Sequence, residues 1–327
     1  MVTIALDAMG GDHAPREIVK GALSAAKEYG FNIILVGDEL KVKAELSRHA
    51  PHKNLSVVNA SQVIEMNESP VAAVKQKKDA SVNIAVALVK NGQADAIVSA
   101  GNTGALMTAA LFGLGRIKGI ERPAIATVFP TEQGPVLLLD MGANVDCKAK
   151  HLVQFAQMGS VFAEHALHRS NPRVGLLNIG EEPEKGNELT LETYPLLKNS
   201  KLNFVGNVES KEILNGKVDV VVCDGFVGNL ILKFSENLAG NIVNMLKKEL
   251  KRNPVTKLGA LMLSPALMNL KKMVDYDEYG GAPLLGLAGV CYKAHGRAKA
   301  KAIKNALRVA GEAATEKVVD YIKNYGA

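Results

Sequence analysis

The sequence of 327 residues contains no tryptophan, and aromatic residues make up only 5% of it. Proteins that bind single-stranded nucleic acid stack bases on aromatic side chains, so we expect no nucleic acid partner. The three cysteines, Cys147, Cys223 and Cys291, are widely spaced and form no CxxC pair. This spacing indicates a reducing compartment and predicts neither a disulfide framework nor a zinc site.

Long apolar runs are also missing. No stretch approaches the roughly 18 consecutive apolar residues that indicate a membrane-spanning helix. The first residues, MVTIALDAMGG, lead directly into an expected strand and lack the basic and apolar regions of a signal peptide. We therefore expect a cytoplasmic protein that is neither secreted nor membrane-spanning.

Several common catalytic motifs are absent. There is no GxGxxG, because GLGRIKG at 113–119 has the wrong spacing, and there is no GxxxxGK(S/T) or GxSxG. None of the seven histidines has Asp five residues later, the arrangement that hydroxyl-directed glycerolipid acyltransferases use. The sequence therefore predicts no standard dinucleotide site, P-loop, serine triad or His/Asp base.

Short β-rich runs, most of them continuously apolar, alternate with helical patterns. Continuous apolar strands are typical of a parallel sheet that is covered on both faces. The pattern predicts an α/β fold of three layers, α/β/α, with a largely parallel, mixed central sheet. We expect one catalytic domain over residues 1–327, with a helical excursion at about 230–275. Strands are expected at 2–7, 32–37, 94–99, 124–129, 135–140, 173–178 and 218–223, and helices at 15–29, 103–116 and 151–169.

Five expected strands end in loops that combine Gly with Asp, Asn or Ser. In an open parallel sheet such ends lie on one edge, where ligands bind. Glycines let backbone N–H groups approach a ligand, and helix N-termini favour anions, so the loops together predict a phosphate site. Any single loop is also explained by a tight turn with a helix cap. The five are DAMGGD at 7–12, SAGNTG at 99–104, DMGAN at 140–144, NIGEE at 178–182 and DGFVGN at 224–229.

These loops, with KGN at 185–187, DYDEYGGAPLLGLAG at 275–289 and HGR at 295–297, closely resemble the phosphate acyltransferases of bacterial phospholipid synthesis, the PlsX family. The resemblance covers essentially the whole chain. It implies a reaction of acyl-[acyl carrier protein] with orthophosphate that gives acyl phosphate and free carrier protein. It also implies a homodimer, hand-over of the product to a glycerol-3-phosphate acyltransferase, and a fold related to phosphotransacetylases and to isocitrate and isopropylmalate dehydrogenases.

Other functions stay open at this stage. The best enzymatic alternative is a phosphotransacetylase that acts on short acyl-CoA. A NAD-dependent dehydrogenase of related fold and a non-catalytic membrane-binding scaffold are weaker alternatives.

Phosphate is itself an anionic nucleophile, and a thiolate is a good leaving group, so the site must mainly supply position and charge stabilisation. We expect Lys185 to meet the phosphate, Asn229 to donate to the thioester carbonyl, and Asn102 to act with them; a solvated loop lysine and a plain helix cap are the alternatives for the first two. Phosphate or acyl phosphate is expected at Ser99, Gly101, Thr103, Gly104, Asn144, Gly10, Gly11, Asp12, Gly180 and Gly228.

The aspartates Asp7, Asp12, Asp140 and Asp224 would repel phosphate unless they orient other side chains, cap helices or hold a cation. Phosphate attack on a thioester needs no metal, so we expect neither a metal nor another cofactor. Cys223 is expected to be a buried strand residue and not an acyl-enzyme nucleophile.

Two basic groups and one apolar segment predict partner surfaces. The basic groups, 293–308 and 247–257, are explained either by solvated helix faces or by docking of an acidic carrier protein or an anionic membrane. The segment at 257–273 has apolar residues between lysines. Dimer packing or core explains it, and so does peripheral membrane contact through Leu258, Leu261, Met262 and Leu267.

Overall fold

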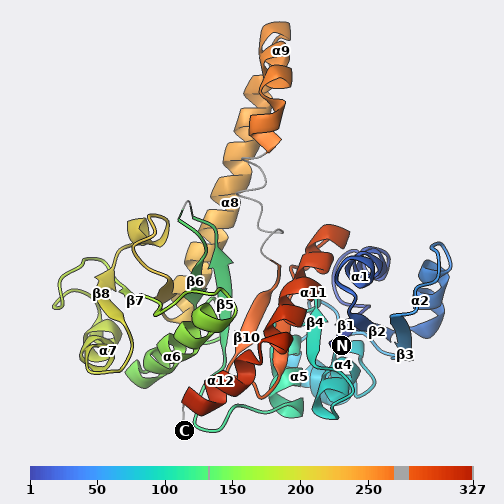
Figure 1. Ribbon diagram of the computed structural model, residues 1–327, viewed down its shortest axis with the longest axis horizontal. Coiled ribbons are helices and arrows are strands. Elements are labelled where there is room, and N and C mark those ends of the chain that lie inside the picture. The colour runs from blue at the N-terminus through green and yellow to red at the C-terminus, as the bar shows by residue number, and fades with distance from the viewer. Residues whose placement is uncertain (132, 269–279, 326–327) are drawn as a thin grey trace.

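The structure, a computed structural model, describes residues 1–131, 133–268 and 280–325 (Figure 1). Its strands form one 11-stranded sheet in the order β3-β2-β1-β4-β11-β10-β5-β6-β9-β7-β8. The strands are β1 (Thr3–Asp7), β2 (Asn32–Gly37), β3 (Leu55–Asn59), β4 (Ala96–Ser99), β5 (Ala124–Phe129), β6 (Val136–Leu139), β7 (Val174–Leu177), β8 (Phe204–Val208), β9 (Val220–Val222), β10 (Ala282–Leu285) and β11 (Val290–Lys293).

Helices cover both faces of the sheet, as the three-layer prediction requires. Successive β1 residues alternate between two hydrophobic clusters: Ile4 and Leu6 face one side, and Ala5 faces the other. The first cluster includes α1 (Arg16–Tyr29), α6 (Ala149–His165), α11 (Ala300–Thr315) and α12 (Val318–Tyr325); the second includes α3 (Pro70–Gln76), α4 (Ser81–Lys90) and α5 (Thr103–Gly113). Two further helices, α2 (Glu39–Leu46) and α7 (Glu188–Lys198), lie near the two ends of the sheet.

The sheet consists of two parallel halves that run in opposite directions. Within β3-β2-β1-β4-β11 and within β6-β9-β7-β8 all pairings are parallel. Between the halves, β10 is antiparallel to β11 and to β5, and β5 is antiparallel to β6. Because these three successive pairings across the sheet are antiparallel, the strands of the second half run opposite to those of the first half. The prediction that all five Gly-containing strand ends lie on one edge is therefore wrong.

A helical arm leaves the body after β9. The 26-residue helix α8 (Gly225–Leu250) extends far beyond the sheet, and α9 (Pro254–Met262) lies against its far end (Figure 1). In α8 only Gly225 and Gly228 are buried, and Val227, Ile231 and Leu232 pack against the second cluster, so the contact of this helix with the described body is concentrated in its first turns. The excursion expected at about 230–275 corresponds to this arm as far as residue 268; residues 269–275 lie outside the described part.

Candidate active site

Two loops of the first half are bound tightly to each other. The Ser99 hydroxyl donates to an Asp7 carboxylate oxygen at 2.7 Å and accepts from the backbone N–H of Gly101 at 3.1 Å. A side chain at Gly10 would place its Cβ 2.6 Å from the Gly101 nitrogen, so only glycine allows the two backbones to touch. Ser99 is fully buried, and its hydroxyl therefore serves this contact between β1 and β4.

The start of β5 and the loop after β6 are bound together in a similar way, by Asp140. This fully buried carboxylate accepts hydrogen bonds from the backbone N–H of Ile125, Ala143 and Asn144 and from the Asn144 side-chain amide. The Asn144 amide also donates to the Pro123 carbonyl at 2.7 Å. Burial raises the pKa of Asp140, and these hydrogen bonds oppose the rise. Asp140 thus orients an asparagine, one of the roles expected for the strand-end aspartates.

Between the two halves lies a cavity of about 430 Å³. Its lining includes Ile125, Thr127 and Ala282 of the reversed strands β5 and β10. Loops from both halves form its walls, so the reversal that separates the strand ends still leaves a shared cleft. The other lining residues are Asp12, Met66, Thr103, Met141, Gly142, Asn229, Leu232, Lys233, Glu236, Lys293, His295, Gly296 and Arg297.

The cleft is rich in basic groups. Lys293, the last residue of β11, is only 9% exposed, and burial lowers its pKa to about 8. His295 accepts a hydrogen bond from the Arg297 backbone N–H through Nδ1, and partial burial lowers its pKa. A lowered pKa favours the neutral imidazole, whose Nδ1 can accept this hydrogen bond. Lys233 and Arg297 add two exposed cations, against the carboxylates of Asp12 and Glu236.

The structure brings three of the predicted site residues into this cleft. Asp12 and Thr103 come from the first half, and Asn229 comes from the second. Asn229 lies in the second turn of α8, and the helix cap is Asp224, whose side chain accepts from the N–H groups of Phe226 and Val227. The capping alternative for Asn229 is therefore excluded.

Lys185 lies elsewhere. It is exposed and does not line the cleft. Its loop neighbours Gly186 and Asn187 instead line a second, larger hollow of about 600 Å³ on the other side of the first turns of α8. That hollow is bordered by Val227 and Ile231, whereas Asn229 points into the cleft. Its charged lining residues, among those described, are acidic, Glu209 and Asp224, whereas the cleft is also lined by basic residues.

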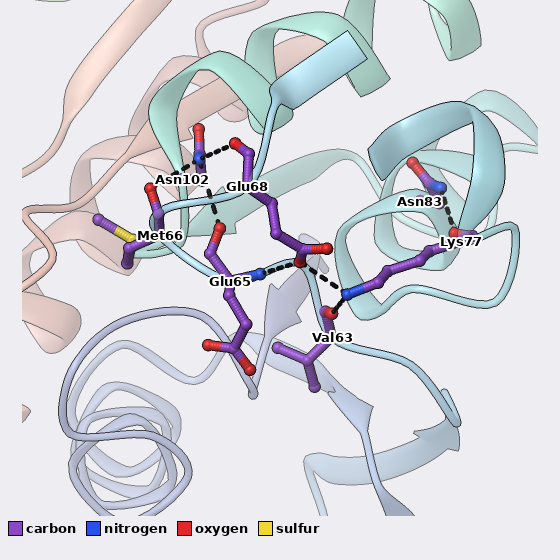
Figure 2. A network of polar contacts seen from close by, with 7 residues as sticks. All are labelled: Val63, Glu65, Met66, Glu68, Lys77, Asn83 and Asn102. Carbon is purple, nitrogen blue, oxygen red and sulfur yellow. Dashed lines mark hydrogen bonds and ion pairs between the residues drawn. The ribbon is translucent and has the colours of Figure 1, made fainter. Parts of the chain in front are cut away.

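The polar atoms of the Asn102 side chain bind to other groups of the protein. Its side-chain oxygen accepts from the Ala105 N–H and caps α5. Its amide nitrogen donates to three carbonyls, those of Glu65, Met66 and Glu68, at 3.4, 3.0 and 3.3 Å (Figure 2). Asn102 therefore fastens segment 65–68, and Met66 of that segment forms part of the cleft wall.

A lysine bridge holds the same segment from its other side. Lys77 Nζ donates to the Val63 carbonyl at 2.7 Å and to the Glu68 carboxylate at 2.6 Å, and that carboxylate also accepts from the Glu65 N–H (Figure 2). The position of Met66 is thus set by hydrogen bonds on both sides.

The remaining predicted site residues do not line the cleft. Gly101, Gly10 and Gly11 belong to the contact between the first two loops, Gly104 packs against Pro70 of α3, and Gly180 lies in the Lys185 loop. Gly228 has a packing role, because a Cβ there would lie 1.9 Å from the Asp140 carbonyl oxygen. Cys223 is buried, and burial raises the pKa of its thiol well above the usual value.

Lys293 is the main cleft residue that the sequence analysis missed. It is the first member of the basic group at 293–308, which was interpreted as a solvated face or a docking surface. For Lys293 that interpretation is wrong, since the side chain is buried. The available signal was the apolar run VCY at 290–292 directly before it, which makes the lysine a strand-end residue.

Comparison with known proteins identifies the family of this chain. The model of a family described as fatty acid synthesis protein matches residues 2–321. A phosphate acyltransferase from Pelotomaculum thermopropionicum is 54% identical over 98% of this chain and 94% of its own length. One from Desulfitobacterium hafniense is 54% identical over 99% of this chain and 97% of its own.

Solved structures with the same fold are more distant in sequence. A phosphotransacetylase from Streptococcus pyogenes superimposes with a TM-score of 0.69 at 17% identity, covering 96% of this chain and 94% of that one. A putative 4-hydroxythreonine-4-phosphate dehydrogenase from Salmonella typhimurium gives 0.55 at 14% identity, covering 95% and 99%. These two confirm the expected relation to phosphotransacetylase-like and dehydrogenase-like folds. The near-complete family match and the 54% identity over the full length show that the chain belongs to the phosphate acyltransferase family of enzymes.

Proposed function

We propose that this acyltransferase moves an acyl group from acyl-[acyl carrier protein] to orthophosphate, as the first step of bacterial phosphatidic acid synthesis. The observation that carries the proposal is the cleft between the two halves of the sheet. It combines a buried cation, two exposed cations and the Asn229 amide within one cavity of about 430 Å³. That set of groups suits an anionic nucleophile that attacks a carbonyl.

The cleft provides what the reaction needs. Phosphate attacks the thioester carbon, a tetrahedral oxyanion forms, and the C–S bond breaks to release the carrier thiolate. Holding phosphate at attack distance contributes about 7–11 kcal/mol. One donor to the oxyanion, the role we give to Asn229, contributes about 3–4 kcal/mol. In the same scheme Lys185 guides phosphate from outside the cleft, and Thr103, at the first turn of α5, adds the partial positive charge of a helix N-terminus.

An acyl-enzyme step is not part of this scheme. Cys223 lines the larger hollow and not the cleft, and its raised thiol pKa leaves almost no thiolate at neutral pH. Direct attack by phosphate is therefore the simpler chemistry.

The arm supports a homodimer. Large apolar side chains repeat every three or four residues along α8 and are 45–68% exposed. A stripe of this spacing covers one side of a helix, and a second copy of the same helix would bury it. The stripe consists of Phe226, Leu230, Phe234, Leu238, Ile242 and Met245.

The tip of the arm supports peripheral contact with an anionic membrane. Leu258, Leu261 and Met262 are 61%, 71% and 78% exposed, and Leu267 is half-buried. The nearby basic group, Lys247, Lys248, Lys251, Arg252 and Lys257, is exposed as well. Among the described residues, no helix is long and apolar enough to cross a membrane. Contact at a membrane surface would place the acyl phosphate where a glycerol-3-phosphate acyltransferase takes it over.

The test is a direct assay. Purified protein is incubated with acyl-[acyl carrier protein], with and without orthophosphate, while free carrier thiol and hydroxylamine-trappable acyl phosphate are measured. We expect both products to appear, and only when phosphate is present. Thiol without trapped product would identify a thioesterase, and turnover of acyl-CoA alone would identify a phosphotransacetylase.

A further inference from the structure

Lys293 is a buried lysine that lines the cleft. It ends β11, where it pairs with Ser99 of β4 on one side and with Ala282 of β10 on the other. It therefore lies in the middle of the sheet, at the first of the three strand reversals. Its side chain is 9% exposed and still lines the cavity.

Among the residues that the structure describes, no carboxylate contacts the Lys293 ammonium. Its Nζ donates to the backbone carbonyls of Ala100, at 3.4 Å, and Ala294. Within the described part of the chain, no Asp or Glu oxygen lies within 4.0 Å of it to form an ion pair. A buried ammonium is costly unless it is paired. Two carbonyls occupy two of its three N–H groups, which leaves one for a ligand.

Lys293 remains a cation at neutral pH. Burial lowers its pKa to about 8, and nearby Lys233 acts in the same direction. The carboxylates of Asp7 and Asp12 oppose the shift from the first half of the sheet. The other charged or titratable groups around the cavity are Glu236 on α8 and His295 and Arg297 after β11.

We propose that Lys293 Nζ binds the attacking phosphate in the cleft and is a catalytic residue of the transfer. This inference rests on the proposed function and adds a residue to it. Lys233 and Arg297 are exposed to solvent, and Lys233 is also 3.6 Å from Glu236. Charge interactions are stronger where water is excluded, so the buried lysine contributes more to phosphate binding than the two exposed cations.

The main test compares Lys293→Met with Lys299→Met. Methionine keeps a long, unbranched side chain and removes the charge. Lys299 belongs to the same basic group but is exposed and does not line the cavity. We expect Lys293→Met to raise the KM for phosphate and the Kd of inorganic phosphate measured without acyl donor by roughly ten- to hundredfold, and Lys299→Met to leave both unchanged. An unchanged Kd in folded Lys293→Met overturns the inference, and so does a loss confined to kcat.

A second test uses the unmodified enzyme and does not depend on the folding of a variant. Inorganic sulfate, whose charge does not change near pH 8, serves as a competitor of phosphate. An anion favours the protonated lysine, so sulfate affinity should be full below about pH 8 and fall by up to tenfold per pH unit above it. Lys293→Gln should lose this fall. Affinity that does not change across that range in the unmodified enzyme overturns the inference.

Failure of the inference and failure of the proposed function have different signatures. Phosphate-dependent turnover with an unchanged phosphate Kd in Lys293→Met rejects the role of Lys293 and keeps the function. Lys293-dependent phosphate binding without acyl phosphate production rejects the function and keeps the anion site.

Discussion

Asn229 and Lys185 lie on different sides of α8, so their substitutions should have different effects. In the proposed mechanism Asn229 donates to the oxyanion, so we expect Asn229→Ala to lower kcat by roughly 10²–10³ with little change in the KM for phosphate. Lys185→Ala removes an exposed cation outside the cleft, and we expect a few-fold higher KM that is sensitive to salt. Steady-state kinetics at limiting phosphate checks both.

Lys201→Ala is the control for Lys185→Ala, since Lys201 is another exposed lysine. Turnover close to that of the unmodified enzyme in both Asn229→Ala and Lys185→Ala would remove these two residues from the mechanism.

Asn102 has two separable functions, and two substitutions separate them. Asn102→Ser keeps a side-chain oxygen of the kind that caps helices but loses the amide donors to segment 65–68, whereas Asn102→Ala loses both. We expect Asn102→Ala to lower the free energy of unfolding by about 1 kcal/mol more than Asn102→Ser, because a cap is worth about that much. Denaturant titration measures the difference. Equal stabilities would show that the cap contributes nothing.

The sequence predicts where such residues lie along an element, but not which distant residues they contact. Spacing correctly indicated that Asn102 lies at a helix start, and that Asp140 and Asn144 lie together after a strand. The three carbonyls that Asn102 holds are 34 to 37 residues away, and local pattern carries no information on that contact. Lys293 was missed for the same reason, because its burial depends on pairing with strands that are distant in sequence.

At the scale of elements, α8 offers a matched pair of glycines. Gly228 lies so close to the Asp140 carbonyl that a Cβ would approach its oxygen to 1.9 Å, whereas a Cβ at Gly240 has nothing within 4 Å. We expect Gly228→Ala to destabilise the protein by about 1–3 kcal/mol or more through overpacking. Gly240→Ala should stabilise α8 by about 0.5–1 kcal/mol through helix propensity. Chemical unfolding measures the change in the free energy of unfolding for each variant. A loss of stability in Gly240→Ala would show that Gly240 also lies in a close contact.

The elements themselves were largely predictable, and their directions were not. All seven predicted strands occur, because most of them are continuous apolar runs. Four others were not predicted: β3 and β8 at the sheet ends and the short β10 and β11 in its middle. Since β10 takes part in two of the three reversals, missing it led to the wrong expectation that all the strand ends meet on one edge.

At the scale of the whole molecule, the body and the arm differ in where their apolar side chains lie. The body holds the cleft, and its two hydrophobic clusters account for the buried core. The arm buries almost nothing and exposes an apolar stripe along α8 and an apolar tip on α9. Exposed apolar surface of this extent marks an interaction site, so we relate the stripe to a second copy and the tip to a membrane.

The two surfaces can be separated by charge substitution. Phe234→Glu with Leu238→Glu places two carboxylates in the stripe, and Leu258→Glu with Leu261→Glu places two in the tip. We expect the stripe variant to be monomeric in analytical ultracentrifugation, because burying an unpaired charge costs several kcal/mol. The tip variant should remain dimeric and lose co-sedimentation with anionic liposomes, since it loses apolar area and gains charge that the membrane repels.

A dimeric stripe variant would exclude pairing through α8, and unchanged liposome binding by the tip variant would exclude the tip as the membrane contact. Should the stripe variant lose liposome binding as well, membrane contact would require two tips held together, which is the behaviour expected of two weak anchors acting through one rigid dimer.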